Sequence, residues 1–148
     1  MSIPTNLNIA AVSYNNVSIP LAGGGGGPEL ITSITVTAQR SVQVNIDSSW
    51  FNTYDFVVIV PNVTASASDW MYVVPDATSG GNYTNKNTTF GKKGTTILFS
   101  SNSKIAFTIE LDRLNGYASS YLSSYLYYYM YTSTITMTGT FDIYGITM

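Results

Sequence analysis

Carboxylate side chains are the residues of this chain with the clearest potential for acid–base or metal chemistry. Glu110 and Asp112 alternate onto one face of a predicted strand, and paired carboxylates can carry out glycoside hydrolysis. Asp69, Asp76 and Asn82 lie in or beside polar segments and could supply oxygen ligands to Ca²⁺. Their spacing matches no EF-hand loop, so we interpret them as turn residues and the Glu110 pair as a solvated strand face. We therefore predict no catalytic residue and no metal ligand.

Two residue types that most often carry catalysis are missing from the sequence. It contains no histidine and no cysteine, so it has neither the commonest general base nor a thiol nucleophile. The run Gly23–Gly27 is followed by Pro28 and not by a helix, so it does not match a phosphate-binding loop. We predict that the chain is not an enzyme and that it binds no cofactor.

Tyrosine is concentrated in the stretch 117–131. Tyrosine combines a large rigid apolar body with a polar tip, a combination that is favoured at protein interfaces. From Tyr125 onward every second residue is a tyrosine, so a strand would place these side chains on one face and Leu126, Tyr128 and Met130 on the other, and one of the two faces must be core. Subunit contact, an ordinary sandwich core and stacking on sugar rings are the three interpretations. We favour subunit contact and predict the interface residues Tyr121, Tyr125, Tyr127, Tyr129 and Tyr131.

The elements that must position these tyrosines are strands. Residues 104–112 alternate apolar and polar side chains, which indicates a half-buried strand. A sustained helical period occurs in no window of the chain, although a helical turn at Tyr117–Tyr125 is a rival to an extended loop that runs into a strand. Polar turn segments are expected at 62–68 and 75–94. We predict an all-β, single antiparallel β-sandwich of jelly-roll type with strands at 30–38, 42–47, 54–60, 69–74, 95–99, 104–112, 125–131, 133–138 and 140–146.

The first 28 residues differ from the rest of the sequence. Short apolar runs alternate with Asn, Ser and Pro and end at the five glycines Gly23–Gly27. Such a glycine run is flexible, so apolar residues lie beyond a hinge. One interpretation is an N-terminal arm that packs on another subunit; the other is a first strand of the same domain. We predict an arm at 1–28 and a sandwich domain at 29–148, with arm contacts from Ile9, Val12, Ile19 and Leu21.

Composition narrows the range of partners. Charged residues make up 9% of the 148 residues, against about 25% in a typical globular protein, and the net charge is −2. This charge provides no field for a polyanion, so we predict no nucleic-acid partner. The chain contains no apolar run of the roughly 20 residues that a membrane helix needs, so we predict no membrane partner.

Several short motifs resemble a family of small β-sandwich proteins from the virions of tailed bacteriophages. The stretch Leu30–Thr37 reads L-I-x-S-x-T-V-T, the strand that includes Tyr54–Val60 follows an alternating strand, and Ile143–Ile146 reads I-Y-G-I. The resemblance covers roughly residues 30–146. The chain departs from the family at Ile46–Tyr54, where a proline of the usual junction is missing, and at Val74–Tyr83, where a family motif survives only loosely.

The resemblance implies a structural role on the exterior of a virion that is assembled in the host cytoplasm. The expected function is a capsid cement or decoration protein, and the expected partners are the major capsid protein, other virion subunits and further copies of the chain, in a homotrimer. The alternative is a module at a tail fibre or tail tip that contacts glycan on the host surface. The trimer is implied by the resemblance to phage decoration proteins alone.

Overall fold

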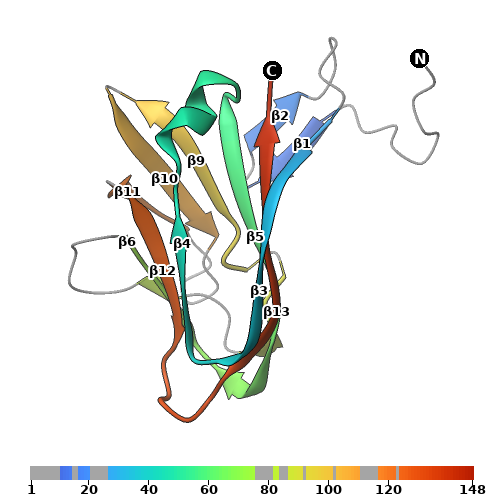
Figure 1. The fold of residues 1–148 in the computed structure, drawn as a ribbon, viewed down its shortest axis with the longest axis vertical. Helices are drawn as coiled ribbons and strands as arrows, with labels where there is room; N and C mark the ends of the chain where they lie inside the picture. Colours follow the sequence, from blue (N-terminus) through green and yellow to red (C-terminus); the bar gives the residue numbers. More distant parts are fainter. Residues whose placement is uncertain are drawn as a thin grey trace, which may run out of the picture.

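A computed structural model describes residues 11–14, 17–20, 27–75, 82–83, 87–91, 93–101, 103–110, 117–122 and 124–148. Nearly all of these residues lie in strands or in the turns between them (Figure 1). The elements are β1 (Ala11–Tyr14), β2 (Val17–Pro20), β3 (Glu29–Gln39), β4 (Ser41–Asn45), the 3-10 helix η2 (Ser48–Asn52), β5 (Phe56–Asp69), β6 (Met71–Pro75), β7 (Asn82–Tyr83), β8 (Asn87–Thr89), β9 (Thr96–Ser101), β10 (Lys104–Glu110), β11 (Tyr117–Leu122), β12 (Tyr125–Met130) and β13 (Met137–Ile146).

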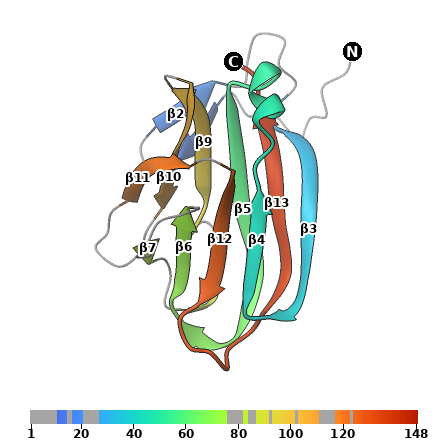
Figure 2. The ribbon, with the colours of Figure 1, turned by 60° about the vertical axis from the view of Figure 1, so that its left-hand side comes forward.

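Two antiparallel sheets pack face to face and form a β-sandwich, which confirms the predicted fold class (Figures 1 and 2). The larger sheet has seven strands in the order β11-β10-β9-β5-β13-β3, with β8 paired to β5. The smaller sheet has four strands in the order β4-β12-β6-β7. The chain passes repeatedly from one sheet to the other, so neighbours in the sequence such as β3 and β4 lie in different layers.

The core lies between the two sheets and is filled by alternate residues of their strands. In β10, Ile105, Phe107 and Ile109 point into it, as the alternation of the sequence predicts. Burial of each such aliphatic or aromatic side chain stabilises the fold by about 1.5–3 kcal/mol. The largest fully buried side chains are Tyr128, Phe90, Phe107, Phe141, Ile59, Met71, Leu98, Ile109, Leu126, Met130 and Met137.

The prediction of a polar loop at 62–68 is wrong. The strand β5 continues through Pro61 to Asp69 and pairs with β13 along its length from Phe56 to Ala65. A proline cannot donate to a ladder, so it is rare inside a sheet. On the side of β5 away from β13, residues 57–59 pair with β9 and residues 64 and 69 pair with β8. Pro61 lies between these two paired segments, so no hydrogen bond from its position is needed on that side.

The two strands expected at 133–138 and 140–146 are one strand that begins later. Residues 131–136 form a turn, and β13 then runs without interruption from Met137 to Ile146. The predicted bounds leave out Gly139, but it lies within β13 at a register shift, with φ of 143°, a conformation that glycine tolerates. The extended loop expected before residue 125 is also wrong, because Tyr117–Leu122 forms the strand β11 against β10. The segment 75–94 contains the short strands β7 and β8.

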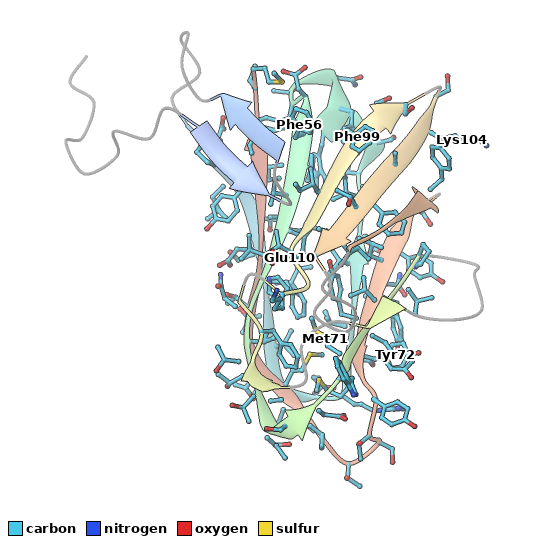
Figure 3. The ribbon with its side chains drawn as sticks, turned by 180° about the vertical axis from the view of Figure 1, so that it is seen from behind. Phe56, Met71, Tyr72, Phe99, Lys104 and Glu110 are labelled. Carbon is cyan, nitrogen blue, oxygen red and sulfur yellow. The ribbon has the colours of Figure 1, made fainter. Side chains whose placement is uncertain are left out.

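The N-terminal strands β1 and β2 pair with each other and form a separate two-stranded sheet. Figures 1 and 3 show this hairpin at the end of the sandwich where β5 begins, on the side of the larger sheet that faces away from the smaller one. On that side Val58, Ile97 and Ile146 form a second buried cluster, flanked by Phe56 and Val60. The division of the chain into an arm and a sandwich domain stays a prediction.

Candidate interaction surface

The strand β12 divides its side chains between the core and the outer surface of the smaller sheet. Leu126, Tyr128 and Met130 are fully buried, whereas Tyr125 and Tyr127 on the opposite face are half-buried. The period of two in the sequence produces this division. One face of the tyrosine-rich strand is therefore core, and the other is a row of partly exposed rings.

A tyrosine from the neighbouring strand β6 joins this row. The ring of Tyr72 lies 4.9 Å from that of Tyr129 and stacks at 5.5 Å and 17° on that of Tyr131, and Tyr127 lies 5.7 Å from Tyr129. These separations are typical of favourable aromatic pairs. In Figure 3, Met71 and Tyr72 lie on opposite sides of β6. We call the outer surface formed by these side chains the tyrosine face; it consists of Tyr72, Tyr125, Tyr127, Tyr129 and Tyr131.

Sequence reasoning missed Tyr72, because nothing local to residues 71–75 shows which strand lies beside it. The pairing of β12 with β6 places Tyr72 opposite Tyr129. The signal that could have found it is the alternation Met71, Tyr72, Val73, Val74, in which a tyrosine occupies an outward position. The alternation predicts exposure but not the neighbour.

Polar side chains border the tyrosine face along β4. The Tyr127 hydroxyl donates to Ser41 Oγ at 2.9 Å, and the Gln43 amide donates to Asn45 Oδ1 at 2.8 Å. Gln43 and Asn45 are exposed, so their remaining donors and acceptors face solvent. The face thus combines apolar ring surface with hydrogen-bonding groups at one edge.

Arg40 is the charged residue beside the tyrosine face. Its guanidinium carbon lies 5.7 Å from the centre of the Tyr129 ring, within cation–π range. The same guanidinium donates to the backbone oxygens of Met130 at 3.1 Å and Tyr131 at 3.3 Å. These bonds hold Arg40 against the turn that follows β12, and they give the face one fixed positive charge.

Tyr128 has a structural role despite its place among the clustered tyrosines. Its side chain is fully buried, and its hydroxyl lies 2.8 Å from Thr96 Oγ1 on the opposite sheet. Burial raises the pKa of the Tyr128 phenol well above its usual value, and the hydrogen bond to Thr96 offsets only part of that increase. The phenol therefore stays protonated and links the two sheets through the core.

Tyr121 is not part of the tyrosine face. It lies on β11, the edge strand of the larger sheet, whereas the other four predicted interface tyrosines follow on and after β12 in the smaller sheet. Its side chain is 50% exposed, and the Lys104 ammonium lies 5.4 Å from the ring centre. The change of sheet between β11 and β12 separates residues that the sequence shows as one cluster.

The predicted arm contacts fall largely beyond the part of the chain that the structure describes. Ile9 and Leu21 lie outside the described residues. Val12 in β1 and Ile19 in β2 are cross-strand partners in the hairpin, and their side chains also lie outside the description. The arm contacts stay a prediction.

Asp69 serves as a structural acceptor. It is buried, and its carboxylate accepts bonds from the Thr132 backbone N–H at 2.7 Å and the Thr132 hydroxyl at 3.2 Å. This contact ties the end of β5 to the turn that precedes β13. Asp76 and the Asn82 side chain lie outside the described residues, and among the residues that are described no group of three His, Cys, Asp or Glu side chains could hold a metal ion.

Glu110 forms an ion pair with Lys93 at 3.2 Å, and both side chains are partly exposed. Such a pair contributes little to stability. The residue paired with Glu110 in the sequence pattern, Asp112, lies outside the described residues.

A polar cluster on the outer side of the larger sheet centres on Asp142. Its carboxylate accepts from the Ser33 hydroxyl at 2.7 Å and from the Asn62 amide, so it links β3, β13 and β5. Partial burial acts to raise the pKa of the Asp142 carboxyl, but the hydrogen bonds from Ser33, Asn62 and Thr140 together outweigh it and lower the pKa. The cluster fixes the lateral order of three neighbouring strands.

Comparison of the chain with protein-family models, with curated proteins and with solved structures finds no match. Among the described residues, no helix has the length and apolar character that crossing a bilayer requires.

Proposed function

We propose that the chain is a structural protein of a tailed-phage virion, a capsid cement or decoration protein on the exterior of the head. The motifs at Leu30–Thr37 and Ile143–Ile146 support this proposal by their resemblance to small virion proteins. A β-sandwich is compatible with that family. The proposed partners are the major capsid protein and further copies of the chain, in a homotrimer.

The tyrosine face is the observation that carries the proposal. It gathers five tyrosines on the outer side of one sheet, with Arg40 as the bordering charge. Tyrosine and arginine are enriched among the residues that dominate binding energy at interfaces. Partly exposed rings that stack on each other lose little side-chain entropy on binding, because they are already held in place. The face is suited to contact with a protein surface.

The N-terminal segment supplies the second contact in this proposal. Ordering the run Gly23–Gly27 costs about 1–2 kcal/mol per residue of backbone entropy. Burial of Ile9, Val12, Ile19 and Leu21 on the head lattice returns roughly 1.5–3 kcal/mol per side chain, a gain of the same size as that cost, so the four together could outweigh it. Attachment to the lattice should therefore depend on residues 1–28.

A double substitution tests the tyrosine face. We expect Tyr127→Ser with Tyr129→Ser to weaken binding to purified particles by roughly tenfold or more, because two central rings are removed. Tyr121→Ser is the matched control, since Tyr121 is exposed but lies on the other sheet. Particle cosedimentation measures both variants, after circular dichroism has shown that they fold. Equal binding by the double variant and the control would reject the tyrosine face as the contact.

A second candidate function is glycan binding at a tail fibre or tail tip. The exposed amides of Gln43 and Asn45 favour it, because strand pairing places them opposite Tyr127 and Tyr125 of the tyrosine face. Sugar rings stack on aromatic faces, while amides bond their hydroxyls.

The position of the protein on the particle separates the two functions. Antibody labelling of purified virions, viewed by electron microscopy, should mark the head for a cement protein and the tail for a glycan-binding module. Deletion of residues 1–27 should abolish lattice binding but leave glycan affinity unchanged. If mass spectrometry of purified virions does not detect the chain, both proposed functions are overturned.

A further inference from the structure

The strand β3 forms one edge of the larger sheet. It is eleven residues long and pairs only with β13 in the described sheets. In Figure 2 it is the outermost strand, and no described element is drawn beyond it along most of its length. Most of its side chains are exposed, so its free edge presents backbone N–H and C=O groups to solvent.

The central part of this edge, from Thr32 to Val36, lacks the usual protection against pairing with another strand. Natural edge strands are short, charged, interrupted by proline or distorted by bulges. Between Glu29 and Arg40 the strand carries no charged residue and no proline. The other edge strands are shorter: β4 has five residues, β7 two and β11 six. The β3 edge is thus the longest edge strand of the described sandwich, and it is uncharged between Glu29 and Arg40.

The irregularities of β3 are symmetric about Ile34. The register against β13 is regular from Thr32 to Val36, and it shifts beyond each end of that window, between Thr32 and Leu30 and between Val36 and Gln39. A two-fold axis at Ile34 would therefore pair the regular window with itself. The shifts of one copy would then meet the shifts of the other.

We propose that the β3 edge pairs antiparallel with β3 of a second copy of this chain about a two-fold axis at Ile34. In this register Ile34 lies opposite Ile34, and Ser33 lies opposite Thr35 of the second copy. Hydroxyl side chains and β-branched side chains form favourable cross-strand pairs.

The charges at the two ends of the strand fit the same arrangement. Antiparallel pairing brings Glu29 of each copy close to Arg40 of the other, and both residues are exposed. Parallel pairing or a strand of unrelated sequence would not give this complementarity. The backbone pairing lies on the larger sheet and the tyrosine rings lie on the smaller one, so the pairing does not use those rings, although Arg40 borders both surfaces.

Single cysteines test the register, because the natural chain contains none. Antiparallel partners have Cα atoms about 4.5–5.5 Å apart, a separation that a disulfide can span. We therefore expect Ile34→Cys to form a covalent dimer under mild oxidation, seen on non-reducing electrophoresis. Thr32→Cys is the matched control on the same edge: its two copies would lie about 13 Å apart at roughly 3.3 Å per residue, so no disulfide should form between them. Equal cross-linking of the two variants, or none in either, overturns the proposal.

Charge substitution tests the energetics. Thr35→Lys places the two lysines of the dimer on the same face of the joined sheet, next to the two-fold axis, so their charges repel. We therefore expect dimerisation to be roughly fivefold weaker by light scattering, and the same for Thr35→Glu. A 1:1 mixture of the two variants should recover dimerisation. Thr64→Lys, exposed on β5 of the same sheet, is the control that should not change it. A dimer that resists Thr35→Lys but is lost in the Tyr127→Ser, Tyr129→Ser variant would assign self-association to the tyrosine face and reject the β3 edge.

Discussion

The buried hydrogen bond between Tyr128 and Thr96 should stabilise the sandwich in a way that depends on which partner is removed. Both residues have no exposed surface, and they connect β12 of the smaller sheet to β9 of the larger one. Thr96 Oγ1 also bonds the Gly94 backbone oxygen at 3.1 Å. Because a threonine hydroxyl has a single proton and gives it to Gly94, the Tyr128 hydroxyl must donate to Thr96.

This direction of donation sets the expected magnitudes. Tyr128→Phe removes a donor and leaves Thr96 bonded to Gly94, so the free energy of unfolding should fall by only about 0.5–1.5 kcal/mol. Thr96→Val leaves a buried phenol without an acceptor, so it should cost about 1–3 kcal/mol. The double variant Tyr128→Phe with Thr96→Val also removes the phenol that Thr96→Val leaves without an acceptor, so it should be no less stable than Thr96→Val alone.

Urea unfolding measures these differences. The two tryptophans of the chain provide a fluorescence signal, and thermal melting by circular dichroism provides a second one. For a protein of this size about 1 kcal/mol should shift the melting temperature by about 2–4 °C. If the free energy of unfolding of the double variant falls by the sum of the two single decreases, the two hydroxyls act independently and the bond between the sheets contributes nothing. A larger loss for Tyr128→Phe than for Thr96→Val would reverse the assigned donor.

Three further substitutions test other parts of the fold. Gly139→Ala should lower the free energy of unfolding by about 1–3 kcal/mol or more, since a Cβ there meets the Asn62 backbone at a positive φ; urea midpoints unchanged from the natural chain would contradict this. Asp69→Ala should cost about 1–3 kcal/mol by leaving the Thr132 N–H unpaired, measured in the same way, and a neutral result would show that water replaces the carboxylate. Because the pKa of Asp142 is lowered in the folded state, its contribution to stability should be complete above about pH 4 and lost as the pH falls through the folded-state pKa. The difference in melting temperature between the natural chain and Asp142→Asn should therefore become smaller in acid. A difference that becomes larger in acid would show that the pKa is raised and not lowered.

The sequence by itself determined the local character of the chain. Alternation at Ile105–Ile109 and at Tyr125–Met130 divides the side chains of each strand into two sets, one of which enters the core, because a strand turns successive residues to opposite faces. The same alternation predicted a partly exposed row of tyrosines along β12. The near absence of helical periodicity and the abundance of β-branched and aromatic residues determined the fold class.

Only the tertiary structure decided which strands are neighbours. Tyr72 joins the tyrosine face because β6 pairs with β12, while Tyr121 leaves it because β11 pairs with β10 in the other sheet. Strand pairing joins residues that are distant in sequence, so no local pattern encodes it. Pro61 and Gly139 are residue types that often end strands, yet both lie inside long strands. Pro61 is tolerated because it lies where β5 pairs with neither β9 nor β8, and Gly139 is tolerated because it lies at a register shift.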